Sequence, residues 1–129
     1  MPVAFEELVP YAGDPAALRE ILYGLIVSGF ADLHVFDFPC EETVTDKPRA
    51  SRLVRYQAAL SVYVTSACQH VVKLDEVGRQ LVCLMDGTRN HGQLVRDLAS
   101  IPGTPSAAQI RADLPSSLQW LARMALLEG

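Results

Sequence analysis

The chain has 129 residues, of which 50% are hydrophobic and 20% are charged. This composition is typical of a globular protein and excludes a disordered tail, and the length suffices for one core or for two small lobes. The formal net charge of −4 argues against general binding to nucleic acids or anionic membranes, because both present phosphate groups that recruit basic surfaces.

No segment of the sequence predicts export or membrane insertion. The N-terminus lacks a basic stretch followed by an apolar run, and charged residues such as Arg19 and Asp32 interrupt the longest apolar stretches. The cysteines Cys40, Cys68 and Cys83 are odd in number and widely spaced, which favours reduced thiols over a disulfide framework. We therefore expect a cytoplasmic protein.

The first predicted lobe covers residues 1–38. It opens with an apolar segment at residues 5–9, and Asp14, which precedes a proline, predicts the start of a longer helix that ends near Gly29. The apolar face of this helix comprises Leu18, Ile21, Leu22, Leu25 and Ile26. Imperfect alternation of apolar and polar residues at 32–38 predicts a short strand, which completes the order of a winged-helix-like lobe.

An exposed linker is predicted at residues 39–49, where two prolines and five charged residues occur without apolar periodicity. The second predicted lobe covers residues 50–129 and begins with a helix from Ala50 to Leu60. The expected shared face of this helix comprises Leu53, Tyr56, Gln57 and Leu60. Valines on both sides of Ala67 predict a pair of short strands.

The clearest pattern is a helix, a turn and a second helix between Leu74 and Leu98. The apolar stripes comprise Val77, Leu81, Leu84 and Met85 in the first helix, and Leu94, Val95 and Leu98 in the second. Asp75 is the predicted N-cap of the first helix, and Gly87 is its predicted C-cap. Thr88 or Asn90 is the predicted N-cap of the second helix. Two closing helices are expected, at about 106–112 and 115–127. The predicted fold class is α+β, mainly helical, with two winged-helix-like lobes and short strands.

The sequence predicts no catalytic residue, no metal ion and no cofactor in this chain. No two glycines are separated by one residue, which argues against the glycine-rich turn of a dinucleotide or S-adenosylmethionine site. His34, His70 and His91 lack the spacing of metal ligands. Ser66 and Cys68 lack the strand-to-helix elbow that presents a nucleophile.

One group of residues is a binding candidate. Lys47, Arg49, Arg52 and Arg55 fall within nine residues on an otherwise acidic chain, and helical spacing places the last two on one face. This basic cluster is either a solvated helix face or a surface that docks onto an acidic protein, since arginine suits carboxylate recognition.

Four stretches carry a family resemblance: 48–57 (PRASRLVRYQ), 62–76 (VYVTSACQHVVKLDE), 78–88 (GRQLVCLMDGT) and 118–129 (LQWLARMALLEG). They resemble the C-terminal region of bacterial proteins with a predicted methyltransferase regulatory domain, whose relatives include bacterial protein lysine methyltransferases. The resemblance implies a non-catalytic regulatory or substrate-recognition module. Its implied partners are an S-adenosylmethionine-dependent catalytic domain, in cis or in trans, or the protein substrate, and a homo-oligomer stays open.

Two other functions are weighed against this reading. A winged helix that binds peptides would pair them with an exposed strand edge, at residues 62–64 or 71–73. A DNA-binding helix-turn-helix would direct His91, Gln93 and Arg96 into the major groove, but the acidity of the chain argues against this function.

Overall fold

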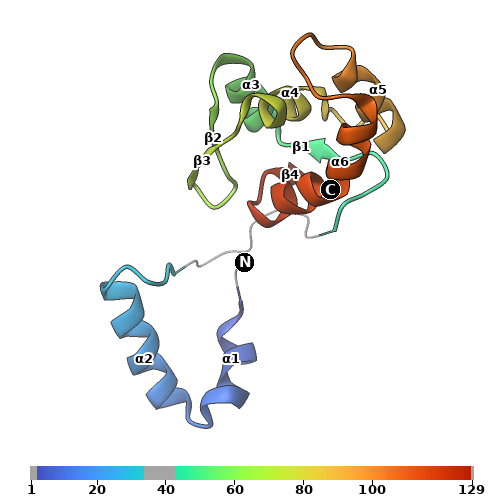
Figure 1. Cartoon of the computed structure of the whole chain (residues 1–129). Helices are drawn as coiled ribbons and strands as arrows, with labels where there is room; N and C mark the ends of the chain where they lie inside the picture. Colours follow the sequence, from blue (N-terminus) through green and yellow to red (C-terminus); the bar gives the residue numbers. More distant parts are fainter. Residues whose placement is uncertain (1–2, 34–42, 129) are drawn as a thin grey trace. The chain divides into compact units, whose positions relative to one another are not determined.

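The computed structural model describes residues 3–33 and 43–128, and the chain divides into two compact units, Met1–Asp37 and Phe38–Gly129 (Figure 1). The described part contains six helices and two antiparallel strand pairs, so the mainly helical α+β class is confirmed. Within these residues no helix is both long and apolar enough to cross a bilayer. The boundaries 1–38, 39–49 and 50–129 stay predictions.

The first unit contains the helices α1 (Phe5–Ala12) and α2 (Pro15–Val27). Gly13 joins them with a φ of 72°, a left-handed conformation that glycine adopts without strain. Asp14 begins α2 as predicted, because its carboxylate accepts a hydrogen bond from the amide of Ala16 at 3.0 Å.

The predicted apolar face of α2 is only partly buried. Leu18 is buried, whereas Ile21 and Leu25 are 58% and 38% exposed. Two short helices meet along one line of contact, so they cannot cover a stripe as wide as the one that the sequence suggests. The predicted strand at 32–38 lies, from residue 34 onward, outside the described residues.

The second unit holds the larger core. Its elements are β1 (Arg49–Ala50), α3 (Arg52–Leu60), β2 (Tyr63–Thr65), β3 (Val71–Lys73), α4 (Glu76–Leu84), α5 (His91–Ala99), α6 (Ala107–Arg123) and β4 (Leu127–Glu128). Helix α4 packs against both α3 and α5, and α5 packs against α6 (Figure 1). The largest fully buried side chains include Met85, Leu94, Leu98, Leu118 and Leu126.

Helix α3 buries the face that carries its small apolar side chains. Val54 and Ala58 are fully buried, whereas Leu53, Tyr56 and Leu60, which belong to the predicted shared face, are 55%, 67% and 72% exposed. The small side chains permit a close approach to α4, whose residue Arg79 donates a 2.8 Å hydrogen bond to the Ala58 carbonyl. The larger apolar side chains of α3 therefore lie on its exposed side.

The predicted strand pair is confirmed as the hairpin β2–β3, in which Val64 lies opposite Val72. Both valines are buried. Gln57 of α3 closes the outer side of β2, because its Oε1 accepts the Thr65 amide at 2.7 Å and its Nε2 donates to the Thr65 hydroxyl at 3.1 Å.

The helix-turn-helix is confirmed with small shifts of its ends. Asp75 caps α4 by accepting the Gly78 amide at 2.6 Å, and Asn90 caps α5 in a reciprocal box with Gln93. Helix α4 ends at Leu84, ahead of the predicted stop, and the turn that follows contains Gly87 with a φ of 86°.

The C-terminal region forms one helix in place of the two predicted. Ser106 caps α6, and Pro115 lies inside it. A proline inside a helix costs about 3 kcal/mol, but four leucine or isoleucine side chains of α6 are buried, each worth about 1.5–3 kcal/mol. The burial of these side chains therefore outweighs the cost of the proline, and α6 continues through Pro115. Ser116 consequently lies in the middle of a helix and not near the start of one, as the sequence suggested.

Strand β1 connects distant parts of the second unit, and the sequence did not predict it. Ala50 pairs with Leu127 of β4, and its amide donates to the Met85 carbonyl at 2.9 Å. Pro48 is fully buried, although the predicted linker included it. The last residues of that segment are thus part of the core.

The core assignment predicts a large effect for Leu98→Ala. This side chain is 1% exposed, so its truncation should lower the free energy of unfolding by about 2–5 kcal/mol. The matched variant Leu60→Ala, at a 72% exposed position, should change it by less than about 0.5 kcal/mol. Urea titrations monitored by the fluorescence of the single tryptophan measure both, and equal effects would contradict the assignment.

The turn predicts a loss of stability in acid. Hydrogen bonds from Thr88, then from Arg89, lower the pKa of Asp86 from 3.8 to about 2. Since the folded-state pKa is depressed, this contribution is complete above the ordinary pKa and is lost as the pH falls from 3.8 toward about 2. Asp86→Asn should flatten this pH dependence, and Thr88→Val should flatten it in part. Urea titrations at several pH values in this range measure the free energy of unfolding. If its dependence on pH is the same in both variants as in the parent, the lowered pKa of Asp86 does not contribute to stability.

Candidate protein-binding surfaces

The basic cluster divides into two kinds of residue. Arg49 lies in β1, with its Nε 3.7 Å from Oε2 of Glu128, and Arg55 donates from Nε to the Ala50 carbonyl at 3.3 Å. Lys47 precedes β1 and Arg52 begins α3, and both are exposed. The hydrogen bond to the Ala50 carbonyl holds Arg55 next to β1. Arg49 and Arg55 are therefore both engaged in contacts within the second unit.

Lys47 and Arg52 are the members best placed to meet a partner. No ion pair or side-chain hydrogen bond of either is present among residues 3–33 and 43–128. Exposed guanidinium groups suit carboxylates, which they bind in a bidentate manner. A protein-binding role for the cluster stays a prediction.

The face of α3 that the sequence groups together forms an exposed apolar ridge beside this cluster, and its exposure was not predicted. It consists of Leu53, Tyr56 and Leu60, which follow one another at helical spacing on the outer face of α3. Arg52 lies next to it at the start of the helix. The signal that could have revealed the ridge is the pair Val54 and Ala58, which forms a second apolar face suited to close packing.

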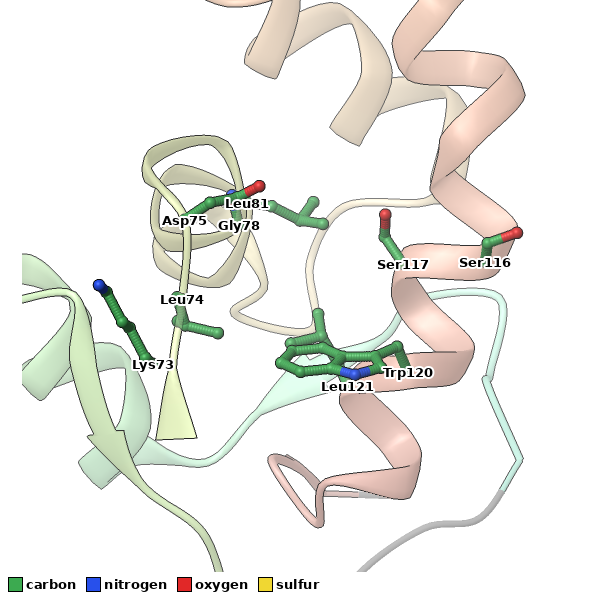
Figure 2. A pocket seen from close by; sticks show the side chains of 9 residues that line it. All are labelled: Lys73, Leu74, Asp75, Gly78, Leu81, Ser116, Ser117, Trp120 and Leu121. Carbon is green, nitrogen blue, oxygen red and sulfur yellow. The ribbon is translucent and has the colours of Figure 1, made fainter. Parts of the chain in front are cut away.

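A pocket of about 470 Å³ lies between the start of α4 and the middle of α6 (Figure 2). Its lining consists of Lys73, Leu74, Asp75, Gly78, Leu81, Ser116, Ser117, Trp120 and Leu121. The leucines are buried, whereas Trp120 is 42% exposed and extends its ring toward α4 (Figure 2). The pocket therefore has an apolar floor with hydroxyl groups on one wall.

The two charged residues of the pocket are partly occupied elsewhere. One oxygen of Asp75 caps α4 through the Gly78 amide. The ammonium of Lys73 lies 5.9 Å from the centre of the Tyr63 ring and is directed away from Trp120 (Figure 2). An apolar group is consequently a better fit for the interior than an ion.

The perturbed carboxylates of the second unit belong to structural ion pairs. The hydrogen bond from Arg79 holds the pKa of Glu76 at about 2, and hydrogen bonds from Arg89 and then Arg96 lower the pKa of Asp97. Neither carboxylate lines the pocket. In the described part of the chain, no three His, Cys, Asp or Glu side chains gather as they would around a metal ion.

The residues predicted to read DNA are engaged within the protein. Nε2 of His91 lies 3.0 Å from the Thr45 carbonyl, Gln93 accepts the Asn90 amide, and Arg96 binds Asp97 at 3.1 Å. These contacts weigh against the DNA-binding alternative, because base recognition needs side chains that are available to the groove.

Residues 46–101 match the family model described as PKMT, C-terminal winged helix domain. This segment is similar to the C-terminal winged-helix domain of protein lysine methyltransferases. The resemblance seen in the sequence is confirmed. The matched segment runs from the loop before β1 to the end of α5, so it contains the basic cluster and the apolar ridge.

Two solved structures share the fold. PKMT2 from Rickettsia typhi in complex with AdoHcy superposes with a TM-score of 0.75 at 16% identity, and PKMT2 from Rickettsia typhi superposes with a TM-score of 0.74 at 17% identity. Each comparison covers 97% of this chain and 30% of the PKMT2 chain, so this chain spans under a third of the length of those proteins. No curated protein matches the chain.

The contacts of the cluster predict different roles for its two helical arginines. Arg55→Ala removes the hydrogen bond to the Ala50 carbonyl and should cost about 1 kcal/mol of stability. Arg52→Ala should stay within about 0.5 kcal/mol of the parent, because this side chain is exposed. Thermal and urea unfolding of the two variants measure these changes in stability. A larger loss of stability in Arg52→Ala than in Arg55→Ala would contradict the assigned roles.

Proposed function

We propose that this chain is a non-catalytic regulatory or substrate-recognition module of an S-adenosylmethionine-dependent protein lysine methyltransferase. The observation that carries the proposal is the match of residues 46–101 to the PKMT C-terminal winged-helix domain. The likeness to PKMT2, one structure of which contains AdoHcy, supports it, since AdoHcy is what S-adenosylmethionine becomes after methyl transfer. The module acts in the cytoplasm.

The catalytic domain is the proposed partner, in the same polypeptide or in a second one. PKMT2 is more than three times as long as the part that this chain covers, which leaves room for such a domain in a relative. The exposed Arg52 and the apolar ridge offer a mixed basic and apolar surface for it, and the protein substrate is the other candidate partner. Partner binding at this surface requires acidic groups beside apolar ones.

The first test concerns the cofactor. The chain alone should bind no S-adenosylmethionine in calorimetry and should transfer no labelled methyl group to protein lysines, because its sequence offers no glycine-rich turn for the cofactor. A methyltransferase with its catalytic domain serves as the positive control. Micromolar binding by this chain would overturn the non-catalytic assignment.

The second test concerns the partner surface. Methyl transfer by the assembly of chain and catalytic domain should fall about tenfold with Arg52→Glu, because the reversed charge repels an acidic partner. Arg111→Glu reverses another exposed charge, on α6, and serves as the matched control. Equal losses in the two variants, or no loss in either, would contradict docking at α3.

A further inference from the structure

Among residues 3–33 and 43–128, no hydrogen-bond partner faces the peptide groups on the outer edge of β3. The Ser66 amide donates to the His70 carbonyl at 2.9 Å, and the Leu74 amide donates to the Val62 carbonyl at 2.7 Å. Hydrogen-bonded pairs recur at every second residue of an antiparallel ladder, so the pair Val64–Val72, which lies between these two bonds, is also hydrogen-bonded. The N–H and C=O groups of Val71 and Lys73 therefore point outward, away from β2.

The two edges of this hairpin differ. Gln57 satisfies the outward amide of Thr65 on β2, as described above. Within the described ranges, β3 has no strand on its other side, and no hydrogen bond to the peptide groups of Val71 or Lys73 is present. Unpaired edges of this kind are templates for an added strand.

The pocket adjoins this edge. Lys73 and Leu74 lead from β3 into it, and Trp120 forms the opposite side (Figure 2). A strand added to β3 places alternate side chains on opposite faces. The residue opposite Val72 would share the inward face of that valine. Leu74, two residues further along, is buried on the same face and lines the pocket.

The chemistry of the edge and pocket defines the occupant. Leu74, Leu81 and Leu121 with the Trp120 ring suit one large apolar side chain, and a volume of about 470 Å³ accommodates it. The neighbouring residue of an added strand would lie opposite the exposed Lys73, where a carboxylate gives a favourable cross-strand pair. The next residue on the other side would lie opposite Val71, which suits a β-branched partner.

We propose that the β3 edge and the adjoining pocket form a groove that binds an extended segment of the protein substrate. The segment runs antiparallel to β3 and carries, in order, an acidic residue, a large apolar residue and a β-branched residue. The inference rests on the proposed function, since it names the part of the substrate that the module would recognise. Main-chain hydrogen bonds supply affinity, and the pocket supplies selectivity.

The test uses the complete chain and a synthetic peptide, acetyl-Ser-Glu-Phe-Val-Thr-amide, in a nitrogen-15 NMR titration. The expected result is a saturable shift of the Val71 and Lys73 amide signals and of the Trp120 indole signal. N-methylation of the Glu and Val amides should abolish binding, because these two amides would donate to β3. N-methylation of the Phe amide, which would face away from β3, should leave the main-chain bonds intact.

Two variants locate the site. Val71→Pro removes one outward amide without breaking a bond to β2 and should weaken binding about fivefold, whereas Val71→Thr keeps the amide and should bind as the parent does. Trp120→Ala should weaken binding at least about tenfold, because it removes the aromatic side of the pocket. Circular dichroism verifies that each variant is folded.

Three outcomes would overturn the proposal: no shift at β3, equal binding of all N-methylated peptides, or parent-like affinity in folded Val71→Pro and Trp120→Ala. Dimerisation through β3, seen as concentration-dependent sedimentation that Val71→Pro abolishes, would also overturn it in favour of a second copy as occupant. Each result is independent of S-adenosylmethionine and of the catalytic domain. Failure here is therefore distinguishable from failure of the proposed function, which the cofactor and methyl-transfer assays decide.

Discussion

The second unit depends on the hydrogen bond from the Ala50 amide to the Met85 carbonyl, at 2.9 Å. This bond holds the end of α4 against a two-residue strand whose other side pairs with Leu127 near the end of the chain. Ala50 is fully buried, so a larger side chain would separate these segments. The next residue, Ser51, caps α3. Three segments distant in sequence, around Ala50, Met85 and Leu127, thus meet at this point, and Ser51 connects it directly to the start of α3.

The same junction relates the framework to the candidate surfaces. Arg49 lies against Gly87, where a Cβ atom would be 3.3 Å from the arginine Cδ, so the turn and the basic cluster are in direct contact. Helix α3 then carries the apolar ridge outward while Gln57 on its flank closes the edge of β2. One helix therefore covers one edge of the hairpin and leaves the other edge open. The surface and the groove are two results of one packing arrangement.

Local interactions were predictable from the sequence, and long-range ones were not. Asp14, Asp75 and Asn90 cap helices within three residues of themselves, so their roles are visible in the sequence. The buried face of α3 depends on how closely α4 approaches it, and β1 exists only because β4 returns to it. The basic cluster was visible as a run of charges. The contacts of its arginines with Ala50 and Glu128, and the pocket between α4 and α6, needed the fold.

Pro115 lies in α6 directly before the residues that form one wall of the pocket. It has no amide hydrogen to give to the carbonyl of Arg111, so α6 lacks one backbone hydrogen bond at that point. Buried side chains hold the helix on both sides of the missing bond: Ile110 and Leu114 before it, and Leu118, Leu121 and Ala122 after it. The core itself therefore positions the pocket wall of Ser116, Ser117 and Trp120, and the continuity of the helix ladder is not needed for it.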